Sequence, residues 1–227
     1  MKQMDDNIGY VLKKLEEMGE LDNTIIAFTT DNGGESQTFP DGGMTPFKAN
    51  KLTTWEGGMR VPMVVRWPGH IKPGTLKTEI FASYDWLPTF VNIAGAPKGD
   101  GLKKLIEAGQ YPGIVKTTLD GVDQRDYFEG KTEKSARDYF FYYTGATPSA
   151  VRYNNWKIYF TMEGSTGAAA LKGPQTFGCA QVQNIKRDPF EQAIGALSGG
   201  KSALSTGGSL GAPMTAFQYD FNILPLG

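Results

Sequence analysis

The sequence predicts an α/β fold in which a sheet flanked by helices is followed by a small α+β domain with an antiparallel sheet. Three observations support this class. An amphipathic helical pattern near the N-terminus runs directly into an apolar, β-branched segment. A second apolar segment and a second helical pattern follow before residue 97. Beyond residue 137, short aromatic-rich segments alternate with turn residues, as in a meandering antiparallel sheet.

The 227 residues are 40% hydrophobic, which is enough to bury a substantial core. We expect residues 1–97 to form the α/β segment. Residues 98–118 are rich in glycine and lysine in their first half and are expected to be a linker or insertion. Residues 119–227 are expected to form the small C-terminal domain, although residues 193–213 are rich in Gly, Ser and Ala and read as loop.

Each element of the first segment has a local signal. A helix is predicted from a cap at Asp5 or Asp6 to a stop at Gly19, because its apolar residues recur at helical spacing: Ile8, Val11, Leu12, Leu15 and Met18. Residues 24–29 then show little alternation, which is typical of a strand covered on both faces. A second strand is predicted over residues 61–67, and a second helix from Ser83 or Asp85 to Gly95.

In the second half, strands are predicted over residues 137–143, 150–153 and 156–161, with Asn154 and Asn155 as a hairpin turn.

Composition excludes several classes of function. The formal net charge is −1 and no dense Lys/Arg run occurs, so nucleic acid is not expected as a partner. One histidine and one cysteine exclude a Cys/His zinc cluster, so any metal must use oxygen ligands. No apolar run approaches the roughly 20 residues of a membrane span, so no membrane association is expected.

Asp31 and Asn32 are the first candidate site residues. They follow the apolar strand, and ligands of α/β sheets bind at the carboxyl ends of strands. Their carboxylate and amide oxygens are the ligands that calcium and magnesium prefer. On these residues alone the alternative is stronger, since Asp-Asn-Gly is also an ordinary turn.

The wider context resembles the sulfatase family. The resemblance is carried by Thr30-Asp31-Asn32-Gly33, by the run from Lys51 through Trp55-Glu56-Gly57-Gly58 to Arg60-Val61-Pro62, by Trp67-Pro68-Gly69 and by Asp85-Trp86-Leu87-Pro88-Thr89, in family order. It is strong over residues 5–97, returns at Leu119-Asp120-Gly121-Val122-Asp123, and continues weakly through Trp156-Lys157 to Arg187-Asp188-Pro189.

The resemblance implies the C-terminal part of an arylsulfatase-like hydrolase of sulfate esters, with a partial alkaline-phosphatase-like sheet. It implies that Asp31 and Asn32 are ligands of the family's divalent cation, usually calcium. It also implies that Lys51, four residues before the aromatic residue of the Glu-Gly-Gly motif, binds the substrate sulfate. The implied partner is a small-molecule sulfate ester. Arg60 is expected to form an ion pair with Glu56 rather than to reach the site.

Other family features have no counterpart. Family members use a formylglycine made from Cys or Ser in a C/S-x-P-x-R motif, and no proline here has Cys or Ser two places before it. No catalytic residue is therefore assigned, and Cys179, followed by Ala180, is expected to be a small core residue. Two acidic metal ligands and the active-site histidines are also missing, and His70 reads as a surface turn residue.

We therefore expect a C-terminal sulfatase fragment that is inactive alone and self-associates through an exposed sheet edge. Two alternatives stay open. A phosphomonoesterase or phosphonate hydrolase of the same superfamily shares the metal scaffold, and a non-catalytic module could bind partners through the aromatic-rich sheet. Retained binding of calcium and sulfate would favour the enzyme classes. The compartment stays open too: no signal peptide is recognised, and family members are often periplasmic or secreted.

Overall fold

The computed structural model describes residues 1–35, 43, 45–110, 118–163 and 173–192. The chain divides into two compact units, each built from two separate stretches of sequence. Unit 1 contains Met1–Thr29 and Met63–Arg137, and unit 2 contains Thr30–Pro62 and Asp138–Gly227. These units interleave along the chain, unlike the contiguous segments 1–97, 98–118 and 119–227 expected from the sequence. That division stays a prediction.

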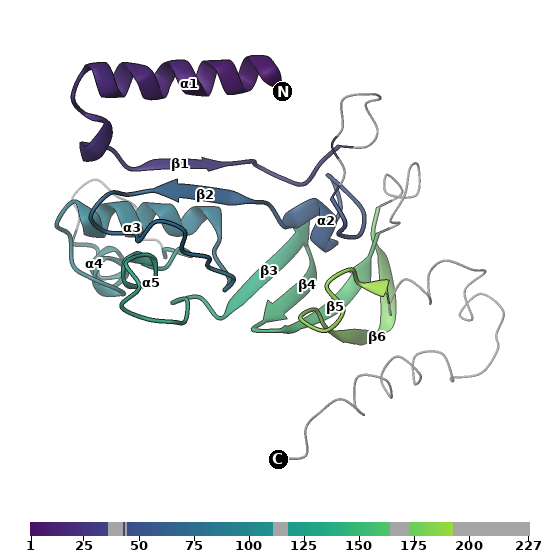
Figure 1. Ribbon diagram of the computed structural model, residues 1–227. Coiled ribbons are helices and arrows are strands. Elements are labelled where there is room, and N and C mark those ends of the chain that lie inside the picture. Colours follow the sequence, from purple (N-terminus) through teal and green to yellow (C-terminus); the bar gives the residue numbers. More distant parts are fainter. Residues whose placement is uncertain (36–42, 44, 111–117, 164–172, 193–227) are drawn as a thin grey trace. The chain divides into compact units, whose positions relative to one another are not determined.

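Unit 1 combines helices with a two-stranded sheet (Figure 1). Its elements are α1 (Lys2–Glu17), η1 (Leu21–Asn23), β1 (Ile26–Thr29), β2 (Met63–Arg66), η2 (Ser83–Asp85), α3 (Trp86–Ile93), α4 (Gly101–Glu107) and α5 (Arg125–Phe128). Strands β1 and β2 are antiparallel, and Ile26 lies opposite Arg66. Helix α4 lies in the stretch expected to be a linker or insertion, where the sequence predicted no helix.

Strand β1 is more exposed than its apolar sequence predicted. Phe28 is 46% exposed and Val64 of β2 is 67% exposed. The expectation of a strand covered on both faces is therefore wrong for this chain. Beside β1, the apolar face of α1 and Phe28 line an open groove of about 660 Å³ that contains Met4, Ile8 and Val11.

The core of unit 1 lies around α3 and α5. The rings of Phe81, Trp86, Phe90 and Phe128 pack on one another with centroid separations between 4.7 and 5.3 Å. Tyr127 is also buried, at 3% exposure. In the described part of the chain, no helix has the length and apolar character that a transmembrane span requires.

Unit 2 is built on a four-stranded antiparallel sheet in the order β3-β4-β5-β6. The strands are β3 (Tyr139–Thr144), β4 (Thr147–Tyr153), β5 (Trp156–Met162) and β6 (Gln175–Asn184), and one helical turn, α2 (Glu56–Met59), lies beside the end of β3 (Figure 1). Asn154 makes the β4–β5 turn with φ 51°, as its turn chemistry predicted. Strand β6 was not predicted.

The core of unit 2 joins the sheet to the loop before α2. Trp55 packs on Tyr159 at a centroid distance of 5.6 Å, and both side chains cluster with Tyr142 and Ala150. All four are at most 3% exposed. The predicted class, an α/β segment followed by an antiparallel sheet, is confirmed.

Candidate functional site

Asp31 and Asn32 lie in a tight turn at the start of unit 2. The backbone N–H of Asn32 donates to Asp31 Oδ1 at 2.9 Å, and Thr30 Oγ1 donates to the Asn32 carbonyl at 3.2 Å. Asn32 Nδ2 donates to the Gly33 carbonyl at 2.9 Å, which fixes the orientation of the amide. Asp31 is exposed and Asn32 is half-buried. The turn therefore carries one carboxylate and, on the next residue, one amide of fixed orientation.

Lys51 forms a backbone hydrogen bond to the end of this turn. Its backbone N–H donates to the Gly34 carbonyl at 2.9 Å, and its ammonium lies 3.5 Å from Glu35 Oε2. Both side chains of that ion pair are nearly two-fifths exposed, at 38% and 39%. The motifs that begin at Thr30 and at Lys51 are thus neighbours in space, and an anion can reach the Lys51 ammonium from solvent.

Glycines allow the two motifs to come this close. The Gly33 N–H donates to the Gly58 carbonyl at 2.9 Å, and a Cβ on Gly33 would lie 1.7 Å from the Gly57 carbonyl oxygen. A Cβ on Gly57 would lie 2.3 Å from the carbonyl oxygens of Lys48 and Ala49. No side chain fits at either position, so the backbone of residues 30–34 (the Asp31 turn) lies directly against the backbone of residues 48–58 (the Lys51 loop).

Glu56, the acidic residue of the second motif, is a buried structural group. Its Oε1 accepts a hydrogen bond from Lys157 Nζ at 3.1 Å and one from Tyr142 Oη at 2.9 Å. Burial alone would raise the pKa of Glu56, but the nearby Lys157 and Arg152 and these hydrogen bonds outweigh it and lower the pKa. The expected ion pair between Glu56 and Arg60 is wrong, because Lys157 is the cation at this carboxylate.

Arg60 instead lies over the ring of Phe47, with its guanidinium carbon 4.5 Å from the ring centroid. It is exposed. Its exclusion from the sulfate site stays a prediction.

Two further glutamates hold the same loop. Glu191 Oε2 accepts the Glu56 N–H at 2.7 Å, and its Oε1 lies 2.8 Å from Lys157 Nζ. Glu163 Oε2 accepts the backbone N–H and the hydroxyl of Thr54, at 2.9 and 2.6 Å. Lys157, Glu163 and Glu191 were not singled out from the sequence. Lysine and glutamate side chains are normally exposed to solvent, so the sequence pattern gave no signal that these three residues are buried.

Lys48 is a second lysine of the Lys51 loop with a distinct environment. Its ammonium lies 3.6 Å from the centroid of a Trp55 ring and donates to the Glu191 carbonyl at 3.2 Å. Burial lowers the pKa of Lys48 to about 8, although the charge of Glu191 partly opposes this. Lys48 therefore serves the packing of the loop, whereas Lys51 projects toward solvent.

The Asp-Trp-Leu-Pro-Thr motif is also structural. Asp85 is fully buried, and Arg137 Nη2 donates to its Oδ1 at 2.6 Å. The same carboxylate accepts the N–H of Val122 at 2.9 Å, and Arg137 also donates to the Asp120 carbonyl at 2.7 Å. This network ties the motif to the second region of resemblance, Leu119-Asp120-Gly121-Val122-Asp123, within unit 1.

Two minor expectations have different outcomes. His70 is exposed, stacks on Trp67 at 4.1 Å and lies 2.9 Å from Glu129 Oε1, so its assignment to the surface is confirmed. Cys179 lies in β6, but its side chain falls outside the described residues, and its expected place in the core stays a prediction.

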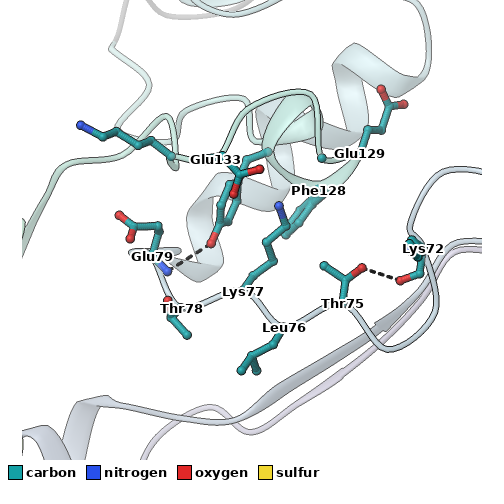
Figure 2. Close-up of a pocket in the computed structure, with 12 residues that line it drawn as sticks. Lys72, Thr75, Leu76, Lys77, Thr78, Glu79, Phe128, Glu129 and Glu133 are labelled. Carbon is teal, nitrogen blue, oxygen red and sulfur yellow. Dashed lines mark hydrogen bonds between the residues drawn. The ribbon is translucent and has the colours of Figure 1, made fainter.

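Unit 1 also has an open pocket of about 630 Å³ between residues 72–79 and the α5 region (Figure 2). Several of its polar groups contact one another. Tyr127 Oη accepts the Glu79 N–H at 3.1 Å, and Lys77 lies 4.5 Å from the centroid of the Tyr127 ring. None of the residues expected to bind metal or sulfate lines this pocket, so we place the candidate site at the Asp31 turn and the Lys51 loop.

Comparison with known proteins gives consistent matches. The family model described as Sulfatase matches residues 1–96. Arylsulfatase A from Homo sapiens is 32% identical over 205 residues, covering 84% of this chain and 37% of that protein. Steryl-sulfatase from Homo sapiens is 30% identical over 216 residues, covering 85% of this chain and 34% of that protein. The chain thus spans about a third of the length of these relatives.

Solved structures agree with the sequence matches. The PsFucS1 sulfatase from Pseudoalteromonas sp. superposes with a TM-score of 0.71 at 26% identity, covering 99% of this chain and 42% of that one. A second structure, a complex with its substrate D-glucosamine-2-N,6-O-disulfate, has a TM-score of 0.52 at 22% identity and covers 96% of this chain and 39% of that one. The second likeness supports the fold alone.

Proposed function

Since this chain belongs to the sulfatase family, we propose that its protein hydrolyses sulfate esters and that this chain supplies the sulfate-binding lysine and two metal ligands. The observation that carries the proposal is the hydrogen bond of 2.9 Å from the Lys51 N–H to the Gly34 carbonyl. This bond makes the turn of Asp31 and Asn32 a neighbour of the Lys51 loop. A site that binds a cation and a tetrahedral anion together requires oxygen ligands for the cation close to a positive charge for the anion.

Lys51 is the proposed sulfate ligand. An ammonium is a compact positive charge with three donors, and charge-assisted hydrogen bonds to anionic oxygens are among the strongest in proteins. Its side chain is 38% exposed, so an incoming sulfate can reach it without a rearrangement of the core. The carboxylate of Glu35, at 3.5 Å, occupies the position of an anionic partner.

Asp31 and Asn32 are the proposed ligands of a divalent cation, with calcium as the specific proposal. The donor types fit, since calcium takes carboxylate and amide oxygens. These two residues do not complete a calcium site, because calcium binds six to eight oxygen ligands. Within the described residues, no group of three or more His, Cys, Asp or Glu could hold a metal. A bound cation would offset negative charge on the sulfate, and we expect this chain alone to bind it weakly.

No residue of this chain is proposed as the nucleophile. The only cysteine is Cys179, and no C/S-x-P-x-R motif occurs in the 227 residues. The contribution proposed for this chain is therefore binding and orientation of a small-molecule sulfate ester. We expect no turnover by the chain alone, because Lys51, Asp31 and Asn32 cannot supply covalent catalysis.

Titration of the isolated chain with sulfate, followed by NMR chemical shifts, tests the lysine. We expect a dissociation constant on the order of millimolar, as for a single charged contact, and a loss of binding in Lys51→Met. Lys14→Met is the matched control, because Lys14 forms a surface ion pair with Glu17 at 2.6 Å with 49% and 46% exposure. Equal loss in both variants, or none in Lys51→Met, contradicts the proposal. Submicromolar calcium binding would contradict the incomplete metal site.

We further propose that the chain self-associates through the edge of its β1–β2 sheet. The sheet has two strands, and Phe28 and Val64 are 46% and 67% exposed. Exposed apolar edges are templates for pairing with a second chain. Sedimentation should reveal concentration-dependent dimers that Val64→Lys weakens, while the control Leu76→Lys, at an 84% exposed residue outside the strands, does not. A monomer at high concentration contradicts this proposal.

A further inference from the structure

Lys157 is a buried cation with a complete set of hydrogen-bond partners. It lies in β5 and is 0% exposed. Its ammonium donates to the Thr54 carbonyl at 2.8 Å, to Glu191 Oε1 at 2.8 Å and to Glu56 Oε1 at 3.1 Å. An ammonium has three donors, so each one is used. Two of the three acceptors belong to the loop that follows Lys51.

Residues 54–56 are held by hydrogen bonds to Lys157, Glu191 and Glu163. Lys157 binds the Thr54 carbonyl and the Glu56 carboxylate, and Glu191 binds the Glu56 N–H at 2.7 Å. Trp55 Nε1 donates to the Glu163 carbonyl at 3.0 Å. The base of the Lys51 loop is therefore held by residues that lie 101 to 135 positions away in sequence.

Backbone hydrogen bonds connect residues 54–56 to Lys51. The Gly57 N–H donates to the Lys48 carbonyl at 2.8 Å, and the Gly58 carbonyl accepts the Gly33 N–H at 2.9 Å. The Lys51 N–H then donates to the Gly34 carbonyl at 2.9 Å. Because no Cβ fits between these backbones, a shift of Glu56 moves its glycine neighbours and the Asp31 turn with it.

We propose that Lys157 is a positioning residue for Lys51: it holds Thr54 and Glu56 in place so that the Lys51 loop presents its ammonium beside the Asp31 turn. The inference rests on the proposed role of Lys51 in sulfate binding. Lys157 does not contact the sulfate. Stability alone does not explain a lysine here, since apolar residues often replace buried ion pairs without loss of stability. The three-donor geometry is what an apolar side chain cannot reproduce.

A variant without buried charge separates positioning from stability. Lys157→Met alone leaves the carboxylates of Glu56 and Glu191 without their cation, which is strongly destabilising. The combination K157M/E56Q/E191Q removes that defect and also removes the bond to the Thr54 carbonyl. R137M/D85N is the matched control, because it removes a buried ion pair of unit 1, with 1% and 0% exposure, and none of the contacts of the Lys51 loop.

The readouts are amide hydrogen exchange in the full chain and sulfate affinity. In K157M/E56Q/E191Q we expect the Gly33, Lys51 and Gly57 amides to exchange roughly tenfold faster or more, because their local opening becomes easier. The β3–β4 amides should keep their rates, and sulfate should bind several-fold more weakly. The control should leave the three loop amides unchanged. Unchanged loop amides in the triple variant overturn the proposal.

Tyr142→Phe gives a milder test that retains every charge. It removes the hydrogen bond of 2.9 Å to Glu56 Oε1, and we expect about two- to threefold faster exchange at the same loop amides. No change there also overturns the proposal. Failure of the proposed function has a different signature: Lys51→Met would leave sulfate binding intact, whereas the exchange rates would still report the positioning.

Discussion

Replacement of Glu35 by glutamine should strengthen sulfate binding. The Lys51 ammonium lies 3.5 Å from Glu35 Oε2, so a sulfate must take the place of this carboxylate or share the ammonium with it. Glutamine keeps the shape of the side chain and removes its negative charge. The change therefore tests whether Lys51 is the anion ligand and whether Glu35 competes with the sulfate.

The expected gain in sulfate affinity follows from the solvent exposure of the Lys51–Glu35 ion pair. Both side chains are nearly two-fifths exposed, at 38% and 39%, and exposed ion pairs contribute about 0.2–1 kcal/mol. At about 1.4 kcal/mol per tenfold change, removal of the competitor lowers the sulfate dissociation constant by roughly 1.4- to 5-fold. A separation of 3.5 Å is longer than a tight charged hydrogen bond, so we expect the lower half of this range.

NMR titration with sulfate measures this change at two ionic strengths. The gain from Glu35→Gln should shrink as salt rises, because screening weakens exposed pairs. Glu17→Gln is the control, since Glu17 pairs with Lys14 at 2.6 Å on the surface of α1. Weaker or unchanged sulfate binding in Glu35→Gln, at low salt, would refute Glu35 as a competitor at the Lys51 ammonium.

Three other changes test the supporting structure. Asp85→Asn should cost about 3–5 kcal/mol of unfolding free energy in urea, because it leaves the Arg137 guanidinium, 1% exposed, without its carboxylate; a cost below about 1 kcal/mol contradicts this. Lys48 has a folded-state pKa of about 8, below the ordinary 10.5. The unfolded chain therefore binds more protons between these values, and stability should rise with pH from about 8 toward 10. Lys48→Met should flatten this rise, and equal slopes in the two proteins would contradict it. Leu52 has φ 74° and is 61% exposed. Leu52→Gly should raise the free energy of unfolding by up to about 1 kcal/mol, because the strain of roughly 1–2 kcal/mol exceeds the entropic cost of glycine; a loss of stability contradicts this.

Local sequence signals predicted the regular elements where periodicity was strong. The helical spacing of Ile8 and Leu12 corresponds to α1, and the aromatic segments after residue 137 correspond to β3, β4 and β5. The expected cap of α1 at Asp5 or Asp6 is wrong, since the helix already begins at Lys2. Helix α4 and strand β6 were missed, because a short Lys-rich helix and a Gly-containing strand resemble loop in composition.

The predicted site residues came from motifs, whereas the residues that hold them depend on long-range contacts. Lys157 pairs with Glu56 across 101 residues and with Glu191 across 34. Hydrophobic periodicity describes which face of an element is buried, but it cannot identify a charged partner on a distant segment. Trp156-Lys157 lies in the segment that weakly resembles the sulfatase family, and this resemblance was the one sequence signal that marked the buried lysine.

The Glu-Gly-Gly motif is best explained by packing rather than by chemistry. Glu56 is buried against Lys157, and a Cβ on Gly58 would lie 2.3 Å from the Thr53 carbonyl oxygen, so neither residue is available to a substrate. A Gly33→Ala substitution would force the Asp31 turn away from the Gly57 carbonyl, and with it the hydrogen bond that orders Lys51. The two motifs therefore depend on each other: their buried residues set the distance between them, whereas Asp31, Asn32 and Lys51, the proposed ligand-binding residues, are exposed or half-buried.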